Sequence, residues 1–181
     1  INLSLVKKVI DECFMPVTIG GGIKTFEDIN DLLRIGADKV LIKTMALEDP
    51  DFIVKAVEYF GSQCISVAVD VIFENGKYWI HQKNNDKLLM EIFIDKMNQC
   101  NVGELVISAV HNDGMMMGYD YNLYQKVTQL TSKPVVALGG AGTPSHFIQL
   151  MQTDYNGALA AASIYHFTQF TPQEVKTTLK N

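Results

Sequence analysis

Short apolar runs rich in β-branched residues recur along the chain, and a segment with helical spacing follows each of them. The runs are apolar at nearly every position, which is typical of strands buried on both faces of a parallel sheet. The six predicted strands are residues 16–19, 39–43, 64–70, 104–110, 134–138 and 157–161.

Helix signals lie between these strands. Thr25 can cap a helix, with Asp28 three residues later. Asp49 and Pro50 open a second helix, which should end near Gly61. Further helices are predicted at about residues 87–98 and 122–130, and after Pro144 and Pro172. The order is a first helix and then six strand–helix units, which indicates an α/β protein.

One segment breaks the alternation. Glu74-Asn75-Gly76-Lys77 resembles a hairpin turn between two short extended runs, at 71–73 and 78–81. We interpret residues of about 71–85 as a β-ribbon inserted into one βα loop. No linker-like tract divides the chain, so residues 1–181 are predicted to form a single domain.

Repeated βα units suggest either an open doubly wound sheet or a (βα)8 barrel. Eight such units need about 250 residues. The chain has 181 and begins inside a predicted helix, with Ile1 rather than Met. A barrel therefore requires two units before Ile1, and length alone favours the open sheet.

Composition narrows the function classes. The net charge is −5, from 15 basic and 20 acidic residues, which argues against a nucleic-acid or anionic-membrane surface. No apolar run reaches the roughly 18 residues of a membrane span, and the first residues lack the apolar core of a signal peptide. Cys13, Cys64 and Cys100 form no CxxC pair, so we expect reduced thiols in a cytoplasmic protein.

Small-residue clusters follow three of the predicted strands, at residues 20–22, 139–142 and 161–163. Glycine lets backbone N–H groups approach an anion closely, and the following helix start adds a favourable dipole. The last two clusters fit the phosphate site that barrels place after strands seven and eight. Plain tight βα turns are the alternative.

Ionisable side chains stand at both ends of the predicted strands. Asp70 ends one strand, where a carboxylate can act as an acid or base at the mouth, or simply cap a loop. Asp113 lies in an Asp-Gly turn, which leaves its role open, and His111 beside it can exchange a proton. Lys39 and Glu104 begin two strands and, taken alone, are solvated rim charges. No histidine is spaced for a metal, so we expect neither metal nor cofactor.

Together these motifs resemble one family along the whole chain. They are, in order, 17–23, 36–40, 60–63, 67–70, Gly103-Glu104, Asp113-Gly114, Gly118-Tyr119-Asp120, 139–142 and 159–167. The set is similar to the cyclase subunits of imidazole glycerol phosphate synthase. That resemblance implies a (βα)8 TIM barrel in which these are strands three to eight. The first two strands, with the family's strand-one catalytic Asp, would be absent, so the fragment is expected to be inactive.

The resemblance also implies a reaction and a partner. Ammonia from a glutaminase subunit, bound as a heterodimer, would cross the barrel and attack a phosphorylated small molecule, with ring closure and lyase cleavage in histidine biosynthesis. The implied catalytic residues are Asp70 and Asp113. The implied phosphate-binding residues are Gly22, Thr44, Gly114, Gly140, Ala162 and Ser163. The implied ammonia gate is Lys39 and Glu104, and the implied docking residues are Asp38 and Gln63.

The chain departs from this family at the mouth. Where the family has Ser-Ile-Asn-Thr, the chain has Leu41-Ile42-Lys43-Thr44, and where the family has Asp-Arg-Asp-Gly-Thr, it has His111-Asn112-Asp113-Gly114-Met115. Losing polar groups that position a substrate weakens binding and catalysis. The pattern favours an altered acceptor, as in paralogues that amidinate surface-polysaccharide sugars. Three hypotheses stay open: the histidine cyclase, this ammonia-channelling paralogue, and a non-catalytic scaffold or activator of a glutaminase.

Overall fold

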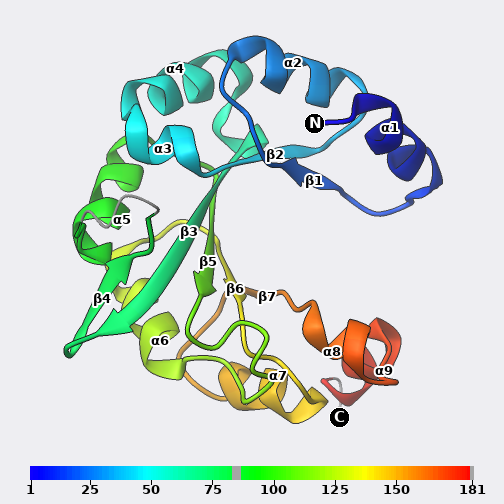
Figure 1. Cartoon of the computed structure of the whole chain (residues 1–181), viewed down its shortest axis with the longest axis vertical. Helices are drawn as coiled ribbons and strands as arrows, with labels where there is room; N and C mark the ends of the chain where they lie inside the picture. Colours follow the sequence, from blue (N-terminus) through cyan, green and yellow to red (C-terminus); the bar gives the residue numbers. More distant parts are fainter. Residues whose placement is uncertain (83–86, 180–181) are drawn as a thin grey trace. The chain divides into compact units, whose positions relative to one another are not determined.

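The computed structural model describes residues 1–82 and 87–179, and the last part of the predicted ribbon, 83–85, lies outside them. The chain divides into two compact units (Figure 1). Unit 1 comprises residues 1–68 and 96–105, and unit 2 comprises residues 69–95 and 106–181. The single domain predicted for residues 1–181 stays a prediction.

Unit 1 holds the first strands and the helices that follow them. Its elements are α1 (Leu3–Glu12), β1 (Thr18–Gly20), α2 (Phe26–Arg34), β2 (Lys39–Ile42), α3 (Thr44–Glu48), α4 (Pro50–Phe60), the 3-10 helix η1 (Ser62–Cys64) and the start of β3 (Ile65–Glu74). The strands pair in parallel, with Thr18 opposite Lys39 and Val40 opposite Ile65. Val40, Ile53 and Ile65 are fully buried, so helix α4 packs its apolar face on this sheet.

Unit 2 continues the alternation. Its elements are the rest of β3, β4 (Lys77–Ile80), α5 (Met90–Gln99), β5 (Glu104–Ala109), α6 (Tyr121–Leu130), β6 (Val135–Leu138), α7 (Pro144–Met151), β7 (Ala158–Leu159), α8 (Ser163–Phe167) and α9 (Pro172–Thr178). The last residues of α5 and the first residues of β5 belong to unit 1. Among the described residues, no helix is long and apolar enough to cross a membrane.

The strand order decides between the two fold hypotheses. It runs β1-β2-β3-β5-β6-β7, with β4 attached to β3 alone. A doubly wound sheet reverses its strand order part-way, whereas a (βα)8 barrel adds each new strand beside the last one. The predicted partial (βα)8 barrel is therefore confirmed, and the open sheet favoured by length is excluded.

The predicted helix starts follow local chemistry. In α2 the Thr25 Oγ1 accepts from the Asp28 N–H at 3.1 Å, and the Asp28 carboxylate accepts from the Thr25 N–H at 2.8 Å. The Asp49 side chain caps α4, and Pro50 opens it. Helices α3 and α8 were not predicted. Each has five residues and no side-chain cap, so neither carries a start signal in the sequence.

Strand β3 runs four residues beyond Asp70, its predicted end, to Glu74. The extension pairs antiparallel with β4, with Val71 opposite Ile80 and Glu74 opposite Lys77. Asn75 and Gly76, between them, have φ of 51° and 75°. Two positive φ angles in a two-residue turn are typical of a type I′ hairpin, which the local Asn-Gly favours. Asp70 thus lies where the parallel part of β3 gives way to the hairpin.

Two buried tyrosines fix the strand ends of unit 2. The Tyr124 hydroxyl donates to the carbonyls of Ile107 in β5 and Leu138 in β6. The Tyr155 hydroxyl donates to the Val135 and Ala158 carbonyls, each at 2.8 Å. Burial raises the pKa of both phenols, so they remain donors. The Tyr124 bonds thus tie β5 to the carboxyl end of β6, and the Tyr155 bonds join the starts of β6 and β7.

Candidate functional site

A charged cluster lies at the strand starts in unit 1. The Lys39 Nζ donates to Oε2 of Glu104 at 2.7 Å, and the Ser66 hydroxyl donates to Oε1 at 2.9 Å. The Glu104 side chain is 15% exposed and Ser66 is fully buried. The structure thus brings the two predicted gate residues into one ion pair. It adds Ser66, which the sequence analysis did not single out because a lone serine in an apolar strand carries no signal.

The two predicted docking residues also belong to unit 1. Asp38 is exposed, and its Oδ2 accepts from the Val17 N–H at 2.7 Å, which holds the segment that leads into β1. Gln63 is exposed on η1, and its amide folds over Gly61, where an added Cβ would lie 2.5 Å from the Gln63 Nε2. Asp38 directly precedes β2 and Gln63 lies two residues before β3, at the end where the gate pair lies.

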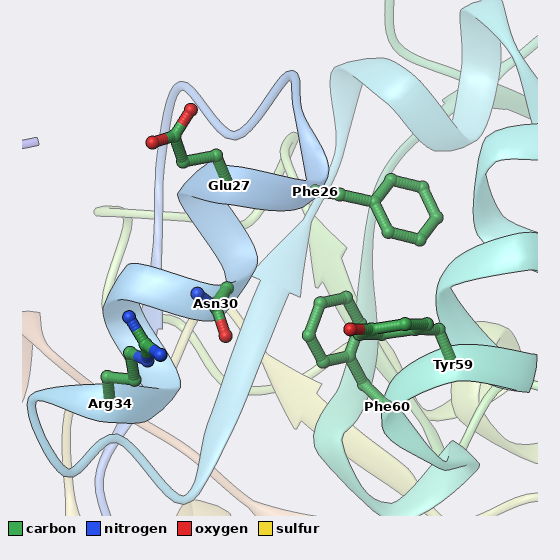
Figure 2. A pocket seen from close by; sticks show the side chains of 6 residues that line it. All are labelled: Phe26, Glu27, Asn30, Arg34, Tyr59 and Phe60. Atoms are coloured by element: carbon green, nitrogen blue, oxygen red, sulfur yellow. The ribbon is translucent and has the colours of Figure 1, made fainter.

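A cavity of about 460 Å³ lies between helices α2 and α4 of unit 1 (Figure 2). Its lining residues are Phe26, Glu27, Asn30, Arg34, Tyr59 and Phe60. Figure 2 shows the polar side chains along α2 and the aromatic rings beside them, with Tyr59 and Phe60 edge to face at 4.8 Å between centroids. Arg34 and Phe60 stand at the ends of their helices, shortly before Asp38 and Gln63. The cavity therefore belongs to the helix layer and not to the predicted phosphate sites.

The phosphate residues predicted in unit 1 follow neighbouring strands. Gly22 has φ +71°, and a Cβ there would meet nothing within 4 Å, so the loop after β1 is open. Thr44 begins α3, whose N-cap Lys43 makes no side-chain capping bond. Because Gly20 pairs with Leu41 in the parallel ladder, both loops leave the same edge of the sheet.

The glycine cluster after β6 packs against the loop after β5. The Gly118 N–H donates to the Gly140 carbonyl at 2.8 Å. A Cβ on Gly140 would lie 2.0 Å from the Gly118 oxygen, so only glycine fits there. The Gly142 N–H donates to Nδ1 of His146 at 3.1 Å, and burial lowers the pKa of that imidazole, which keeps it an acceptor. The Gly142 amide is thus already engaged.

The cluster after β7 lies at a helix start without a side-chain cap, in contrast to the Gly142 amide after β6. Helix α8 begins at Ser163, and its N-cap Ala162 makes no side-chain capping bond. Amide groups at such a start need an acceptor, which water or an anion can supply. The Tyr119 hydroxyl donates to the Ala160 carbonyl at 2.9 Å, and the Ala160 N–H donates to Ala137 at 2.8 Å. The loops after β5, β6 and β7 are therefore joined to one another.

The predicted catalytic carboxylates both lie in unit 2. Asp70 is half-buried, and its backbone carbonyl accepts from the His81 N–H at 2.8 Å. The Val110 N–H donates to the Val71 carbonyl at 2.9 Å, so β5 ends beside this part of β3. Asp113 is exposed, with its N–H bonded to Ala109 at 2.9 Å. Both carboxylates stand where parallel strands end, the edge at which α/β proteins bind ligands.

Comparison with known proteins identifies the family to which this chain belongs. A family model described as histidine biosynthesis protein matches residues 1–171. The chain belongs to this family. A protein provisionally named imidazole glycerol phosphate synthase subunit hisF2, from Vibrio vulnificus, is 40% identical over 99% of this chain and 67% of its own length. Imidazole glycerol phosphate synthase subunit HisF of an Exiguobacterium species is 37% identical over 99% of this chain and 71% of its own length.

The family resemblance drawn from the motifs is thus confirmed, and the similar proteins include both HisF subunits and their hisF2 paralogues. Besides the subunits named HisF, a second provisional hisF2 protein, from Campylobacter jejuni, is 38% identical over 99% of this chain. The residue roles implied by the resemblance stay predictions. No group of three or more His, Cys, Asp or Glu side chains that could hold a metal lies within residues 1–82 and 87–179.

The structure of this family member adds a polar cluster that sequence analysis missed. His111 Nε2 lies 2.8 Å from Oδ2 of Asp120, and the Tyr78 hydroxyl donates to the same carboxylate at 3.0 and 3.1 Å. Burial and the Asp120 charge raise the pKa of Tyr78. His111 was noted alone, because its partner is nine residues away along the chain. Asp120 was noted only within the Gly118-Tyr119-Asp120 motif, and the further signal for its role is its place just before helix α6, where Asp is a favoured cap.

Proposed function

We propose that this chain is part of a cyclase of the imidazole glycerol phosphate synthase type, which uses ammonia from a glutaminase subunit on a phosphorylated substrate. The observation that carries the proposal is the cluster of Lys39, Glu104 and Ser66. In a barrel enzyme that works without a partner subunit, residues at the strand-start rim contribute mainly to the stability of the fold. A half-buried ion pair adds little stability, since desolvation of the two charges offsets most of their attraction. A gate explains why charge is placed there.

The geometry suits a gate for neutral ammonia. Glu104 is held on both oxygens, by Lys39 and by Ser66, so the pair has one defined closed arrangement. Ammonia can accept a hydrogen bond from the Lys39 ammonium group and donate one to the Glu104 carboxylate. The cluster therefore offers both hydrogen-bonding roles that a passing ammonia molecule can use.

At the carboxyl ends of the strands the proposal assigns proton transfer to carboxylates and phosphate binding to backbone amides. Asp70 would exchange protons while ammonia adds to the substrate carbonyl and water leaves, and Asp113 would assist ring closure and cleavage. Gly22 and Thr44 would hold one phosphate. Gly114, Gly140, Ala162 and Ser163 would hold the other. The uncapped start of α8 and the open loop at Gly22 support these assignments.

The glutaminase is proposed to dock as a heterodimer on the strand-start end of unit 1, over Asp38 and Gln63. Tyr59 and Arg34 both line the nearby cavity; Tyr59 is 75% exposed, and Arg34 is exposed as well. Exposed Tyr and Arg are typical of residues that dominate binding energy at protein interfaces. A cytoplasmic location stays a prediction, because it rests on the spacing of the cysteines.

A second candidate is the paralogous ammonia-channelling subunit that serves amidination of a surface-polysaccharide sugar. His111 favours it, because it stands where the histidine-pathway motif begins with Asp, and the structure pairs it with Asp120. A turnover assay separates the two. Full-length protein is supplied with ammonium and the imidazole precursor, and ring closure supports the first candidate. The assay is repeated with the cognate glutaminase and glutamine, and ammonia release without ring closure supports the second candidate. Both candidates are contradicted if the ring does not close and the glutaminase releases ammonia at the same rate with and without this protein.

A further inference from the structure

The loop between β5 and α6 spans residues 110–120, and one side-chain bond closes it at its base. Nε2 of His111, its second residue, lies 2.8 Å from Oδ2 of Asp120, its last. A carboxylate can only accept, so the imidazole carries a proton on Nε2 and donates it. The bond is charge-assisted, which makes it stronger than a bond between neutral groups.

Asp120 is held so that it cannot turn away from His111. Its Oδ1 accepts from the Leu123 N–H at 3.0 Å, which caps α6, and the Tyr78 hydroxyl of β4 donates to both oxygens. The Asp120 side chain is 13% exposed. The carboxylate is therefore a fixed acceptor, supported by the hairpin on one side and by the helix on the other.

The other imidazole nitrogen takes no part in holding the ring. Nδ1 of His111 is buried and has no hydrogen-bond partner among the described residues. The Nε2 bond to Asp120 is therefore the side-chain hydrogen bond that fixes the ring in this part of the structure.

The closed loop carries the residues proposed for the mouth. Inside it, Nδ2 of Asn112 donates to the Gly118 carbonyl at 3.0 Å, and the Gly118 N–H reaches Gly140 at 2.8 Å. Asp113 and Gly114 lie between these two anchors. Displacing the loop base would move both residues and loosen the tie to Gly140.

We propose that His111 is a positioning residue, which closes the β5–α6 loop through Asp120 and so holds Asp113 and Gly114 beside the Gly140 loop. The family pattern has Asp where this chain has His111. A carboxylate there would face Asp120 with like charge, so relatives with that motif must hold this loop by other contacts. The effect on turnover rests on the proposed function, whereas the closure of the loop does not.

Hydrogen exchange tests the closure on this chain without any activity. His111→Ala removes the donor, His111→Asp adds repulsion, and His111→Gln keeps an N–H near the place of Nε2. The histidine is changed because Asp120 also caps α6. We expect loop amides such as Gly118 to exchange about tenfold faster or more in His111→Ala, the scale of one lost charge-assisted bond. His111→Asp should exchange faster still, and His111→Gln close to the unchanged protein.

Thr128→Val serves as the matched control, since its hydroxyl donates within α6, to the Gln125 carbonyl. Faster exchange confined to peptides covering residues 111–120 supports the proposal. Equal exchange in His111→Ala and the unchanged protein overturns it, and so does a uniform increase over both units, which marks general destabilisation.

The effect on turnover is tested in the full-length protein. Displaced phosphate-binding loops should raise KM for the phosphorylated substrate in His111→Ala, with recovery in His111→Gln. A smaller folded fraction would lower the apparent kcat and leave KM unchanged, which would count against positioning. If no turnover occurs with any variant, the proposed function fails while the exchange result stands.

Discussion

At the residue scale, Glu104 shows how neighbours give a side chain its role. From the sequence it is a charge at a strand start, which by default is solvated. In the structure its two oxygens have different donors, Lys39 Nζ at 2.7 Å and Ser66 Oγ at 2.9 Å. Neither partner could be inferred from spacing, because they lie 65 and 38 residues away along the chain. The predicted gate thus became a three-residue cluster only in the fold.

Ser66→Ala tests the support of this cluster. The change leaves Oε1 of Glu104 without its donor, so the folded state should lose about 1–3 kcal/mol. We expect the Tm in thermal unfolding to fall by roughly 2–10 °C. Ser145→Ala, at an exposed position, is the control and should leave the Tm nearly unchanged. An unchanged Tm in Ser66→Ala would mean that the hydroxyl does not support the carboxylate.

Asp70→Asn tests the proposed proton transfer in the full-length enzyme. The amide keeps the shape of the side chain and cannot exchange the proton, so ammonium-dependent turnover should fall by roughly 10²-fold or more. Steady-state kinetics would measure it, with Asp154→Asn at an exposed position as the control. Turnover close to that of the control would remove Asp70 from the mechanism.

At the element scale, the sequence predicted what local chemistry determines. The capping box of α2 and the Pro-led starts of α4, α7 and α9 are encoded within a few residues. The hairpin around Asn75 and Gly76 was predicted as a separate ribbon, whereas in the structure its first run continues β3 to Glu74 and pairs with β4. Helices α3 and α8 were missed because they lack side-chain caps, and they form where a strand's carboxyl end forces a turn.

Thr25→Ala tests the capping box of α2. Removing the hydroxyl should cost about 0.5–2 kcal/mol near neutral pH. The N–H groups of Lys24 and Thr25 and the Thr25 hydroxyl lower the pKa of Asp28 below its ordinary 3.8. The carboxylate therefore contributes stability above that ordinary value and loses it as pH falls through the lowered pKa.

The difference between Thr25→Ala and the unchanged protein should accordingly shrink in acid, as measured by urea unfolding across pH. Thr177→Ala, at an exposed position within α9, serves as the control. A difference that stays constant into the acid range would show that Asp28 takes no part in the cap.

At the scale of the whole molecule, strand order and composite motifs proved more informative than length. Each small-residue cluster alone is a tight turn, and only their succession after neighbouring strands indicated a barrel with a phosphate site. The loops after β5 and β6, which carry Asp113, Gly114 and Gly140, bond to each other through Gly118 and Gly140. The His111–Asp120 pair remained outside the prediction, because its geometry is set by the hairpin and α6 together.

The central claim, that the strand-start cluster passes ammonia from a glutaminase, is tested most directly by comparing two activities of one variant. Full-length Lys39→Ala and Glu104→Ala proteins are assayed with the cognate glutaminase, once with glutamine and once with added ammonium. Lys176→Ala, exposed on α9, is the control. Glutamine-dependent turnover should fall several-fold more than ammonium-dependent turnover, with the roughly 1:1 complex still recovered in a pull-down. Equal loss of both activities, or no complex at micromolar concentrations, would contradict the gate.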